Sequence, residues 1–402
     1  MRILIITPRI PYPPYRGDIL HVFNIAKTLA LKHDVDIITQ IAKKTQQPYV
    51  HELKKFNINT NIIHQSVFAS FMNLLFAMLN KTPFQIAYFA SKKMSALISQ
   101  QTKKKKYDLI YFHLIRSAQY LGSTENSNAI KVCDYTDAVS LYLERYVKFI
   151  RNPFRKIFFY MELNRLKKYE GVAKKFNTVF ICSDEDKKYL GSKILETDFQ
   201  ILRNGVDEKF FYPTNTNYVK HRIIFSGNMP YYPNKDAVKY FAKDIFPRVL
   251  ERYPDSNFFI VGQKPPTSIK RLNSKNIIVT GFVEDIRQEY LLSHVNVAPI
   301  RFGAGTLNKV IESLALGVPV VASGIVIKGL PKELHKYVIQ AESIEEFADK
   351  ISYVFENDSI RNEMMKEAIE IIPKLLGWKP IVDKFENYII TKNKLQFSHL
   401  DD

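Results

Sequence analysis

The stretch that decides the fold runs from Arg301 to Ser323 and reads "RFGAGTLNKVIESLALGVPVVAS". A loop broken by two glycines precedes a helical pattern, Gly317 ends that pattern, and an apolar strand-like run follows. Backbone N–H groups in the first turn of a helix have no partner inside the helix, so this start can bind an anion. Lys309 adds positive charge there, and Glu312 follows on the same face, where a carboxylate can accept hydrogen bonds from ribose hydroxyls. The stretch therefore predicts a diphosphate site, with a surface Lys–Glu pair behind a glycine hinge as the alternative.

Strand-like and helix-like patterns alternate along the whole chain. Residues 19–33, "ILHVFNIAKTLALKH", have apolar side chains at helical spacing, and similar segments separate short β-branched runs. The strand-like runs lie at residues 2–6, 34–39, 107–112, 129–133 and 177–182, and again at 222–227, 257–262, 276–281, 295–300 and 318–323. Such alternation is typical of parallel sheets with helices on both faces. The predicted fold class is therefore α/β.

A break in this pattern divides the chain. Residues 203–221 are rich in turn formers and lack apolar periodicity, which suits an interdomain linker, and 402 residues are too many for one ordinary domain. We predict two doubly wound, Rossmann-like domains over residues 1–212 and 213–376, followed by a helical segment over 377–402 that packs back on the first domain. Two such domains would face a central cleft and bind ligands at the carboxyl ends of their strands.

Two glycines follow the first strand of each half. In "TPRIPYPPYRGD", Gly17 opens a helix whose free N–H groups can receive an anion, although a proline-stiffened loop with Asp18 as its helix cap is the alternative. In "FSGNMPYYPNKDAV", Gly227 would let a ligand approach the backbone, and Lys235 lies within reach of a phosphate. A strand-end glycine is also a common turn residue, so the position of Gly227 in the chain is what favours a binding site.

A third strand end, "VTGFVEDIRQEY", suits a flat nucleotide base. Phe282 and Val283 would lie against the base, with main-chain groups reading its edge. The alternative is that Glu284 and Asp285 are ordinary residues of a helix start, where carboxylates complement the helix dipole.

Composition narrows the partners. Lys and Arg outnumber Asp and Glu by 58 to 40, which favours an anionic partner, but the basic residues are dispersed and no aromatic–basic motif for nucleic acid is present. The two cysteines support neither a disulfide framework nor a cysteine zinc site and fit a reducing cytoplasm. Residues 66–80 are too short an apolar run to span a membrane. They could form an interfacial amphipathic helix, or Phe68, Leu74, Leu75 and Leu79 could be core.

The order of these features resembles the donor-binding half of family 4 retaining glycosyltransferases of the GT-B fold. The most specific part is residues 226–323, with its Ser-Gly strand end, "TGFVED" and "GAGTLNKVIESLALGVPVVAS". In the N-terminal half, "RIPYPPYRGD", "CDYTDAVS", "YEGVAKKF", "SDEDKKYL" and "NGVD" resemble a sugar-transferase subgroup associated with exopolysaccharide gene systems. The resemblance covers nearly the whole chain.

The resemblance implies a role for each matching residue. Gly17 would lie near the donor phosphate and the transfer point, Gly227 would face the donor, and Val283 and Asp285 would lie near the base. The diphosphate and ribose would be held by main-chain N–H groups of Thr306, Leu307 and Asn308, by the charge of Lys309 and by the carboxylate of Glu312. One departure is Ala304, which lies where many members have a glutamate that contacts the transferred sugar.

The implied mechanism needs neither a metal nor a cofactor, because helix N-termini and cations neutralise the leaving diphosphate. Arg301 and Lys309 are the nearest candidates for that charge, with Lys235 as a third. His113, at the end of a strand, would contact the acceptor or the sugar, or be a structural histidine, and Asp137 is a similar candidate.

The predicted function is transfer of a sugar from a nucleotide-diphosphate sugar to a glycan acceptor, in cell-surface polysaccharide biosynthesis. The acceptor would be lipid-linked, and the cytoplasmic protein would make peripheral contact with an anionic membrane through its basic surface. Enzyme alternatives are a nucleotide-sugar epimerase and a sugar-phosphate glycosyltransferase of the same fold. Ala304 leaves open a catalytically silent protein that binds nucleotide sugar or glycan as an assembly partner.

Overall fold

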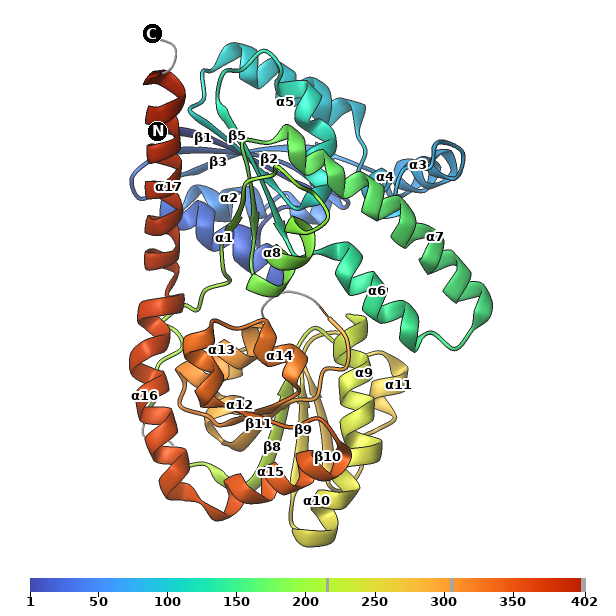
Figure 1. The fold of residues 1–402 in the computed structure, drawn as a ribbon, viewed down its shortest axis with the longest axis vertical. Coiled ribbons are helices and arrows are strands. Elements are labelled where there is room, and N and C mark those ends of the chain that lie inside the picture. Colours follow the sequence, from blue (N-terminus) through green and yellow to red (C-terminus); the bar gives the residue numbers. More distant parts are fainter. Residues whose placement is uncertain (215–216, 304–306, 399–402) are drawn as a thin grey trace. The chain divides into compact units, whose positions relative to one another are not determined.

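The computed structural model describes residues 1–214, 217–303 and 307–398. The chain forms two compact units (Figure 1). Unit 1 comprises Met1–Arg203 together with the chain from Ile381 onward, and unit 2 comprises Asn204–Pro380. Each unit is built on one parallel sheet, so the α/β prediction is confirmed. The predicted cleft stays a prediction.

Unit 1 has a seven-stranded sheet in the order β3-β2-β1-β4-β5-β6-β7, and every pair of neighbours is parallel. Its strands are β1 (Arg2–Thr7), β2 (Asp34–Ile41), β3 (Ile58–His64), β4 (Leu109–His113), β5 (Ile130–Thr136), β6 (Thr178–Ile181) and β7 (Phe199–Ile201). Its α-helices are α1 (Gly17–Leu29), α2 (Tyr49–Lys54), α3 (Val67–Asn80), α4 (Phe84–Ala87), α5 (Lys92–Lys104), α6 (Val139–Phe149), α7 (Pro153–Tyr169) and α8 (Asp184–Gly191). Three 3₁₀ helices, η1 (Lys44–Gln46), η2 (Ile115–Thr124) and η3 (Glu170–Lys175), complete the connections.

Unit 2 has a six-stranded parallel sheet in the order β10-β9-β8-β11-β12-β13. Its strands are β8 (Val219–Ser226), β9 (Asn257–Val261), β10 (Ile277–Gly281), β11 (Ser293–Ala298), β12 (Val320–Ala322) and β13 (Val338–Gln340). Its helices are α9 (Tyr232–Tyr240), the π-helical turn η4 (Phe241–Ile245), α10 (Phe246–Arg252), α11 (Thr267–Lys270), α12 (Ile286–Leu291), α13 (Asn308–Ala315), α14 (Gly324–Lys328), the 3₁₀ helix η5 (Lys332–Tyr337), α15 (Ile344–Glu356) and α16 (Asp358–Leu376). The last helix, α17 (Trp378–Ser398), begins in unit 2 and continues in unit 1.

The strand order places a topological switch in each sheet. In unit 1 the chain passes from β3 to β4 across β1, and in unit 2 it passes from β10 to β11 across β8. The loops that follow the two strands at such a switch run to opposite faces of the sheet. A crevice therefore forms between them at the carboxyl ends of the strands, and ligands bind there. The pairs β1–β4 and β8–β11 therefore mark where each sheet can bind a ligand.

Each of the ten predicted strand-like runs overlaps a strand, because continuous β-branched runs are typical of strands buried on both faces. The sequence did not predict β3, β7 and β13. Strand β3 reads "INTNIIH", in which Asn and Thr interrupt the apolar pattern, and β7 and β13 have only three residues each. Edge strands this short or this polar lack the periodicity by which a buried strand is recognised.

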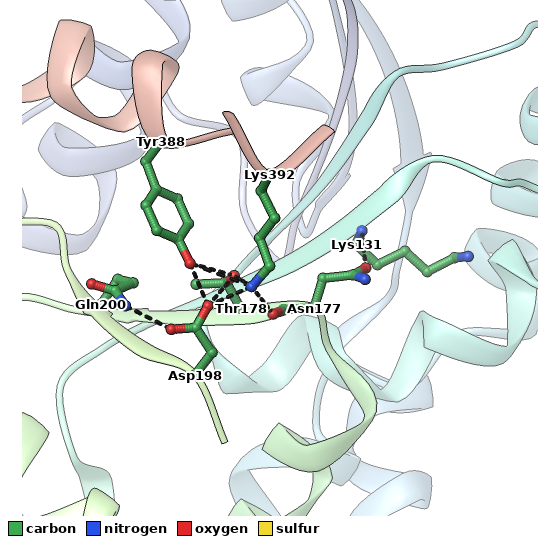
Figure 2. A network of polar contacts seen from close by, with 7 residues as sticks. All are labelled: Lys131, Asn177, Thr178, Asp198, Gln200, Tyr388 and Lys392. Carbon is green, nitrogen blue, oxygen red and sulfur yellow. Dashed lines mark hydrogen bonds and ion pairs between the residues drawn. The ribbon is translucent and has the colours of Figure 1, made fainter. Parts of the chain in front are cut away.

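Helix α17 is tied to the edge of the unit 1 sheet by a polar network (Figure 2). The Lys392 ammonium donates to Thr178 Oγ1 at 2.6 Å and pairs with the Asp198 carboxylate, which also accepts from the Tyr388 hydroxyl. Gln200 donates to the other oxygen of Asp198 at 2.6 Å. Partial burial works to raise the pKa of Asp198, but the hydrogen bonds from Lys392 and Tyr388 lower it to about 2.

Helix α3 is the apolar run that the sequence left open between core and interface. Phe68, Leu75 and Leu79 are exposed and Leu74 is only half-buried, so the interpretation of these four side chains as core is wrong. Only Ser70 and Ala77 of α3 are fully buried, so the side of the helix that contains them packs against unit 1 while the opposite side is exposed. No helix in the described part of the chain is both long enough and apolar enough to cross a membrane.

Candidate functional site

Helix α13 begins at the switch point of the unit 2 sheet, after the strand β11. Leu307 precedes the helix with extended backbone angles and offers no side-chain cap, so the first N–H groups of α13 have no capping side chain. The Asn308 Oδ1 atom is buried and has no hydrogen-bond partner among the described residues. Gly317 has φ +73°, the left-handed value that ends many helices, which confirms the predicted helix end. Within the described residues, the start of α13 thus has hydrogen-bonding groups without a partner.

The Lys309 side chain is buried in the first turn of α13. Its ammonium donates to Asn234 Oδ1 at 2.8 Å and lies 3.7 Å from the centre of the Phe225 ring. Burial lowers the pKa of Lys309 to about 7, although the nearby Glu312 carboxylate works against this shift. A bound anion would supply the negative charge that this buried ammonium lacks.

Gly227 follows β8 directly beneath this ammonium. It has φ +153°, and a Cβ atom at this position would lie 2.7 Å from Asn234 Nδ2 and 3.0 Å from Lys309 Nζ. Real side chains do not approach so closely, so only glycine fits without displacing Asn234 or Lys309. The structure therefore brings together two predicted residues from β8 and α13, and adds a third from α9.

Glu312 lies one turn further along α13 and is half-buried. The Tyr290 hydroxyl lies 3.4 Å from Glu312 Oε2 and contacts the Ser226 hydroxyl at the end of β8. Burial raises the pKa of Glu312 to about 7, while Tyr290 and Lys309 work to lower it. The interpretation as an ordinary surface Lys–Glu pair is wrong, because Lys309 is buried and no ion pair joins it to Glu312 among the described contacts.

The other predicted cations already have partners. Arg301 forms a two-pronged ion pair with Asp236 of α9, at 2.7 and 2.9 Å, and this contact raises the pKa of Arg301. The Lys235 ammonium lies 4.8 Å from the centre of the Tyr232 ring at the start of α9. None of these contacts in the described residues involves Lys309, and the proposed roles of Arg301 and Lys235 stay predictions.

The predicted base-binding residues have clear structural roles. Val283 packs against a small apolar cluster that contains Tyr290, and Phe282 is exposed. Asp285 caps α12 by accepting from the Arg287 N–H at 3.0 Å, and its hydrogen bonds with the Arg287 side chain lower the pKa of Asp285. This carboxylate thus acts as a helix N-cap, which favours the alternative given above for Asp285. Thr306 and Ala304 lie outside the described residues.

In unit 1, Gly17 begins α1 after β1, and a Cβ atom there would meet nothing within 4 Å. The next residue, Asp18, forms ion pairs with Arg9 at 3.1 Å and with Arg16 at 3.2 Å. Burial works to raise the pKa of Asp18, but Arg16 and Arg9 hold it below its ordinary value. Asp18 is therefore the partner of two arginines and not the predicted helix cap, since Arg16 occupies the cap position.

His113 ends β4 in a buried network. Its Nε2 atom lies 2.9 Å from the main-chain oxygen of Asp18, and its Nδ1 atom lies 3.4 Å from the Asp134 carboxylate. Asp134 is fully buried and also lies 3.0 Å from His21 Nε2 and 2.5 Å from the Tyr111 hydroxyl. Burial works to raise the pKa of Asp134, but the two histidines hold it well below its ordinary value. Both ring nitrogens of His113 thus face protein oxygens, which favours the structural alternative.

Asp137 follows β5 and lies close to Cys182 and Asp186. Ligand atoms of these three residues lie within 4.8 Å of one another, a grouping that could hold a metal ion. Hydrogen bonds already account for the grouping: Cys182 Sγ donates to Asp137 at 3.3 Å, and Ser183 donates to Asp186 at 2.7 Å. Burial, together with the charge of Asp186, raises the pKa of Asp137 to about 7.

Sequence reasoning missed Asn234 and Tyr290 in unit 2 and Asp134 in unit 1. Asn234 and Tyr290 each contact a predicted residue, but asparagine and tyrosine inside helices give no motif of their own. Asp134 had one usable signal, a carboxylate inside the apolar run of β5, because a charge is rarely buried without a partner.

Comparison with known proteins agrees with this architecture. Residues 220–357 match the family described as glycosyl transferases group 1. No curated protein matches the sequence. Three similar solved structures are HepE from Anabaena (14% identity, TM-score 0.68, 97% of this chain and 100% of that one), a sucrose-phosphate synthase from Thermosynechococcus elongatus (14%, 0.70, 97% and 99%) and a glycosyltransferase from Rickettsia africae (19%, 0.68, 96% and 97%). Residues 220–357 are therefore similar to group 1 glycosyl transferases, in a chain that has the GT-B fold.

Proposed function

We propose that this protein transfers a sugar from a nucleotide-diphosphate sugar to a glycan acceptor. The observation that carries the proposal is the Lys309 ammonium, buried in the first turn of α13 beside Gly227, within the region that matches group 1 glycosyl transferases. A buried cation at an uncapped helix start is suited to a diphosphate, because the helix and the side chain offer positive charge to the same anion.

Each residue of this site has a chemical task. The main-chain N–H groups of Leu307 and Asn308 donate to the diphosphate, and Lys309 neutralises the charge that develops on it as its bond to the sugar breaks. Gly227 keeps the space beside the ammonium open. Glu312 accepts hydrogen bonds from the ribose hydroxyls, for which its carboxylate must lose its proton, and its position beside Lys309 favours that state.

The comparisons and the charge support a choice of donor and acceptor classes. One solved structure of Anabaena HepE holds UDP-glucose, and a Staphylococcus aureus TarM structure holds UDP and α-GlcNAc-glycerol. These relatives favour a UDP-sugar as the donor to test first. A net charge of +18 favours an acceptor at an anionic surface, and a lipid-linked glycan in cytoplasmic assembly of a cell-surface polysaccharide fits both.

The proposed reaction retains the configuration of the sugar and needs no metal, since Lys309 and the start of α13 can neutralise the leaving group. The test is turnover of a panel of UDP- and GDP-sugars with lipid-linked acceptors, with and without EDTA, and NMR assignment of the new glycosidic bond. Retention and full activity in EDTA support the mechanism. No binding and no turnover with any donor would overturn the transferase proposal.

A second candidate is a catalytically silent protein that binds a nucleotide sugar. It rests on Ala304, which replaces the glutamate expected to contact the transferred sugar. This candidate predicts tight binding of a nucleotide sugar without hydrolysis or transfer. Ala304→Glu separates the two, because the variant would gain turnover only if the missing carboxylate limits activity.

A further inference from the structure

The helix α3 of unit 1 is mostly apolar, yet one broad side of it is exposed. It has 14 residues, of which only Ser70 and Ala77 are buried, and it contains no charged residue. Phe68 is 73% exposed and Leu79 is 83% exposed. A helix that is apolar all round is normally buried, and a contiguous apolar patch on a surface marks an interaction site. The exposed side of α3 is therefore a candidate interaction site.

The helix α7 adds a second apolar face. Phe154, Ile157, Phe158 and Met161 are all exposed and recur at spacings of three and four residues, which places them on one side of the helix. Phe154 is the most exposed of the four, at 82%.

Helix α7 contacts α3 and also α4, the short helix that follows α3 in the chain; Figure 1 labels all three helices. The Arg165 guanidinium of α7 donates to the main-chain oxygen of Ala77 in α3 at 3.1 Å, and the Glu162 carboxylate accepts from the Phe84 N–H at 3.0 Å. The rings of Phe84 and Phe158 stack with their centres 5.4 Å apart. The exposed apolar side chains of these two connected helices are here named the apolar surface. Its most exposed members are Phe68, Phe76, Met78, Leu79, Phe154 and Ile157.

The charge around the apolar surface has one sign. Residues 148–168 contain seven Lys or Arg residues and one acidic residue, Glu162, whose carboxylate is buried against main-chain N–H groups. The stretch 66–93 contains Lys81, Lys92 and Lys93 and no acidic residue. Exposed apolar side chains framed by cations match the interface of an anionic bilayer, where tails take up the former and phosphates attract the latter.

We propose that the apolar surface docks on an anionic phospholipid bilayer, with α3 and the outer face of α7 at the depth of the headgroups. Arg155 and Lys156, exposed on α7, contact the lipid phosphates. No described helix can span the bilayer, so the attachment is peripheral and reversible. This docking is independent of the sugar transfer proposed above.

Co-sedimentation of the full-length protein with lipid vesicles tests the proposal. We expect binding to phosphatidylcholine vesicles that contain phosphatidylglycerol, and weaker binding without it or at high salt. The double variants Phe68→Ser/Leu79→Ser and Phe154→Ser/Ile157→Ser should each weaken binding about tenfold or more. Arg155→Gln/Lys156→Gln should weaken binding only to vesicles with phosphatidylglycerol. These measurements need no sugar transfer, so they stay informative if the transferase proposal fails.

A matched control and two contrary outcomes make the test decisive. Leu31→Ser/Leu195→Ser removes two exposed leucines of unit 1 away from the apolar surface and should leave vesicle binding unchanged. If that control weakens binding as much as the α3 and α7 variants do, the proposal is wrong. It is equally wrong if the protein ignores vesicles and forms a dimer that Phe68→Ser/Leu79→Ser dissociates in analytical ultracentrifugation, because a second copy would then cover the surface.

Discussion

At the scale of single residues, Lys309 has the most testable chemistry. Because burial lowers its pKa to about 7, much of the ligand-free protein holds a neutral lysine above pH 7, whereas a diphosphate favours the ammonium. We expect binding of UDP at pH 8 to take up close to one proton. Calorimetry in two buffers of different ionisation enthalpy measures this uptake.

Substitution identifies the group that takes up the proton. Lys309→Met should abolish the uptake and weaken UDP binding about 10- to 100-fold, the range of a charge-assisted hydrogen bond. Lys235→Met is the matched control, because the Lys235 ammonium lies against the Tyr232 ring, whereas Lys309 donates to Asn234, and it should leave the uptake in place. Uptake that survives Lys309→Met would assign the proton to another group.

The role of Glu312 can be tested by changing the ribose of the nucleotide. If its carboxylate accepts from a ribose hydroxyl, the protein discriminates UDP from 2′-deoxy-UDP or 3′-deoxy-UDP by about 1 to 3 kcal/mol. Glu312→Gln should lose most of that discrimination and bind the nucleotides nearly alike. The raised pKa of Glu312, about 7, adds a dependence on pH: the discrimination should shrink as pH falls below 7 and the carboxylate is protonated. Competition binding with the three nucleotides measures both effects.

Gly227 tests the geometry of the same site. An added Cβ would lie 2.7 Å from Asn234 Nδ2 and 3.0 Å from Lys309 Nζ, so Gly227→Ala must displace one of them. We expect a loss of about 1 to 3 kcal/mol of stability together with weaker UDP binding. Gly191→Ala is the control, because a Cβ there meets nothing within 4 Å, and its melting temperature should match or exceed that of the parent.

The sequence located part of this site, for a physical reason. Gly227, Lys309 and Glu312 were predictable because a strand-end glycine and a helix start recur at fixed places in a parallel α/β sheet. Asn234 was not, since its role depends on α9 packing beside α13, a tertiary contact. The ion pair between Arg301 and Asp236 could not be predicted for the same reason. The two residues are 65 positions apart in the sequence, and no motif links them.

At the scale of elements, the sequence predicted buried strands far better than edges and docked helices. A strand with both faces covered is mostly apolar, and its few polar residues have buried partners, as Asp134 of β5 does, whereas β3 at the edge of its sheet keeps Asn59 and Asn61. The position of α17 depends on side chains that meet across about two hundred residues, as the contact between Tyr388 and Asp198 shows (Figure 2). Helical periodicity identifies such a helix but does not identify the sheet edge on which it docks.

The contacts of Asp198 predict how strongly α17 is held on the sheet. Its folded pKa of about 2 is below the ordinary value of 3.8, so its contribution to stability is present above about pH 4 and is lost as pH falls toward 2. A third of the side chain is exposed, and screening therefore limits the contribution to about 1 to 2 kcal/mol. Asp198→Asn should lower hydrogen-exchange protection of α17 at pH 7 by that amount. Lys32→Met, which removes the exposed ion pairs that Lys32 forms with Asp383 and Glu386 of the same helix, should have a smaller effect.

At the scale of the whole molecule, the division into units predicts how fragments behave. Unit 2 contains Gly227, Asn234, Lys309 and Glu312, and its ends meet through the bridge between Val206 and Gly377. A fragment of residues 204–380 should therefore fold and bind UDP within about tenfold of the full-length protein, because the contacts proposed for the diphosphate and ribose are complete within it. Calorimetry on the purified fragment measures this affinity.

The matching fragment of residues 1–203 should fail, although it holds all seven strands of its sheet. It lacks Phe385, whose ring packs 5.0 Å from Phe180 and 5.8 Å from Tyr111, and Ile389, which is fully buried. Loss of each such side chain costs about 2 to 5 kcal/mol, which together is comparable to the whole stability of a domain. We expect an insoluble or partly folded fragment that becomes soluble when residues 381–402 are co-expressed with it. A cooperative thermal transition of the fragment alone would contradict this, and would reduce α17 to a helix that rests on a sheet already stable without it.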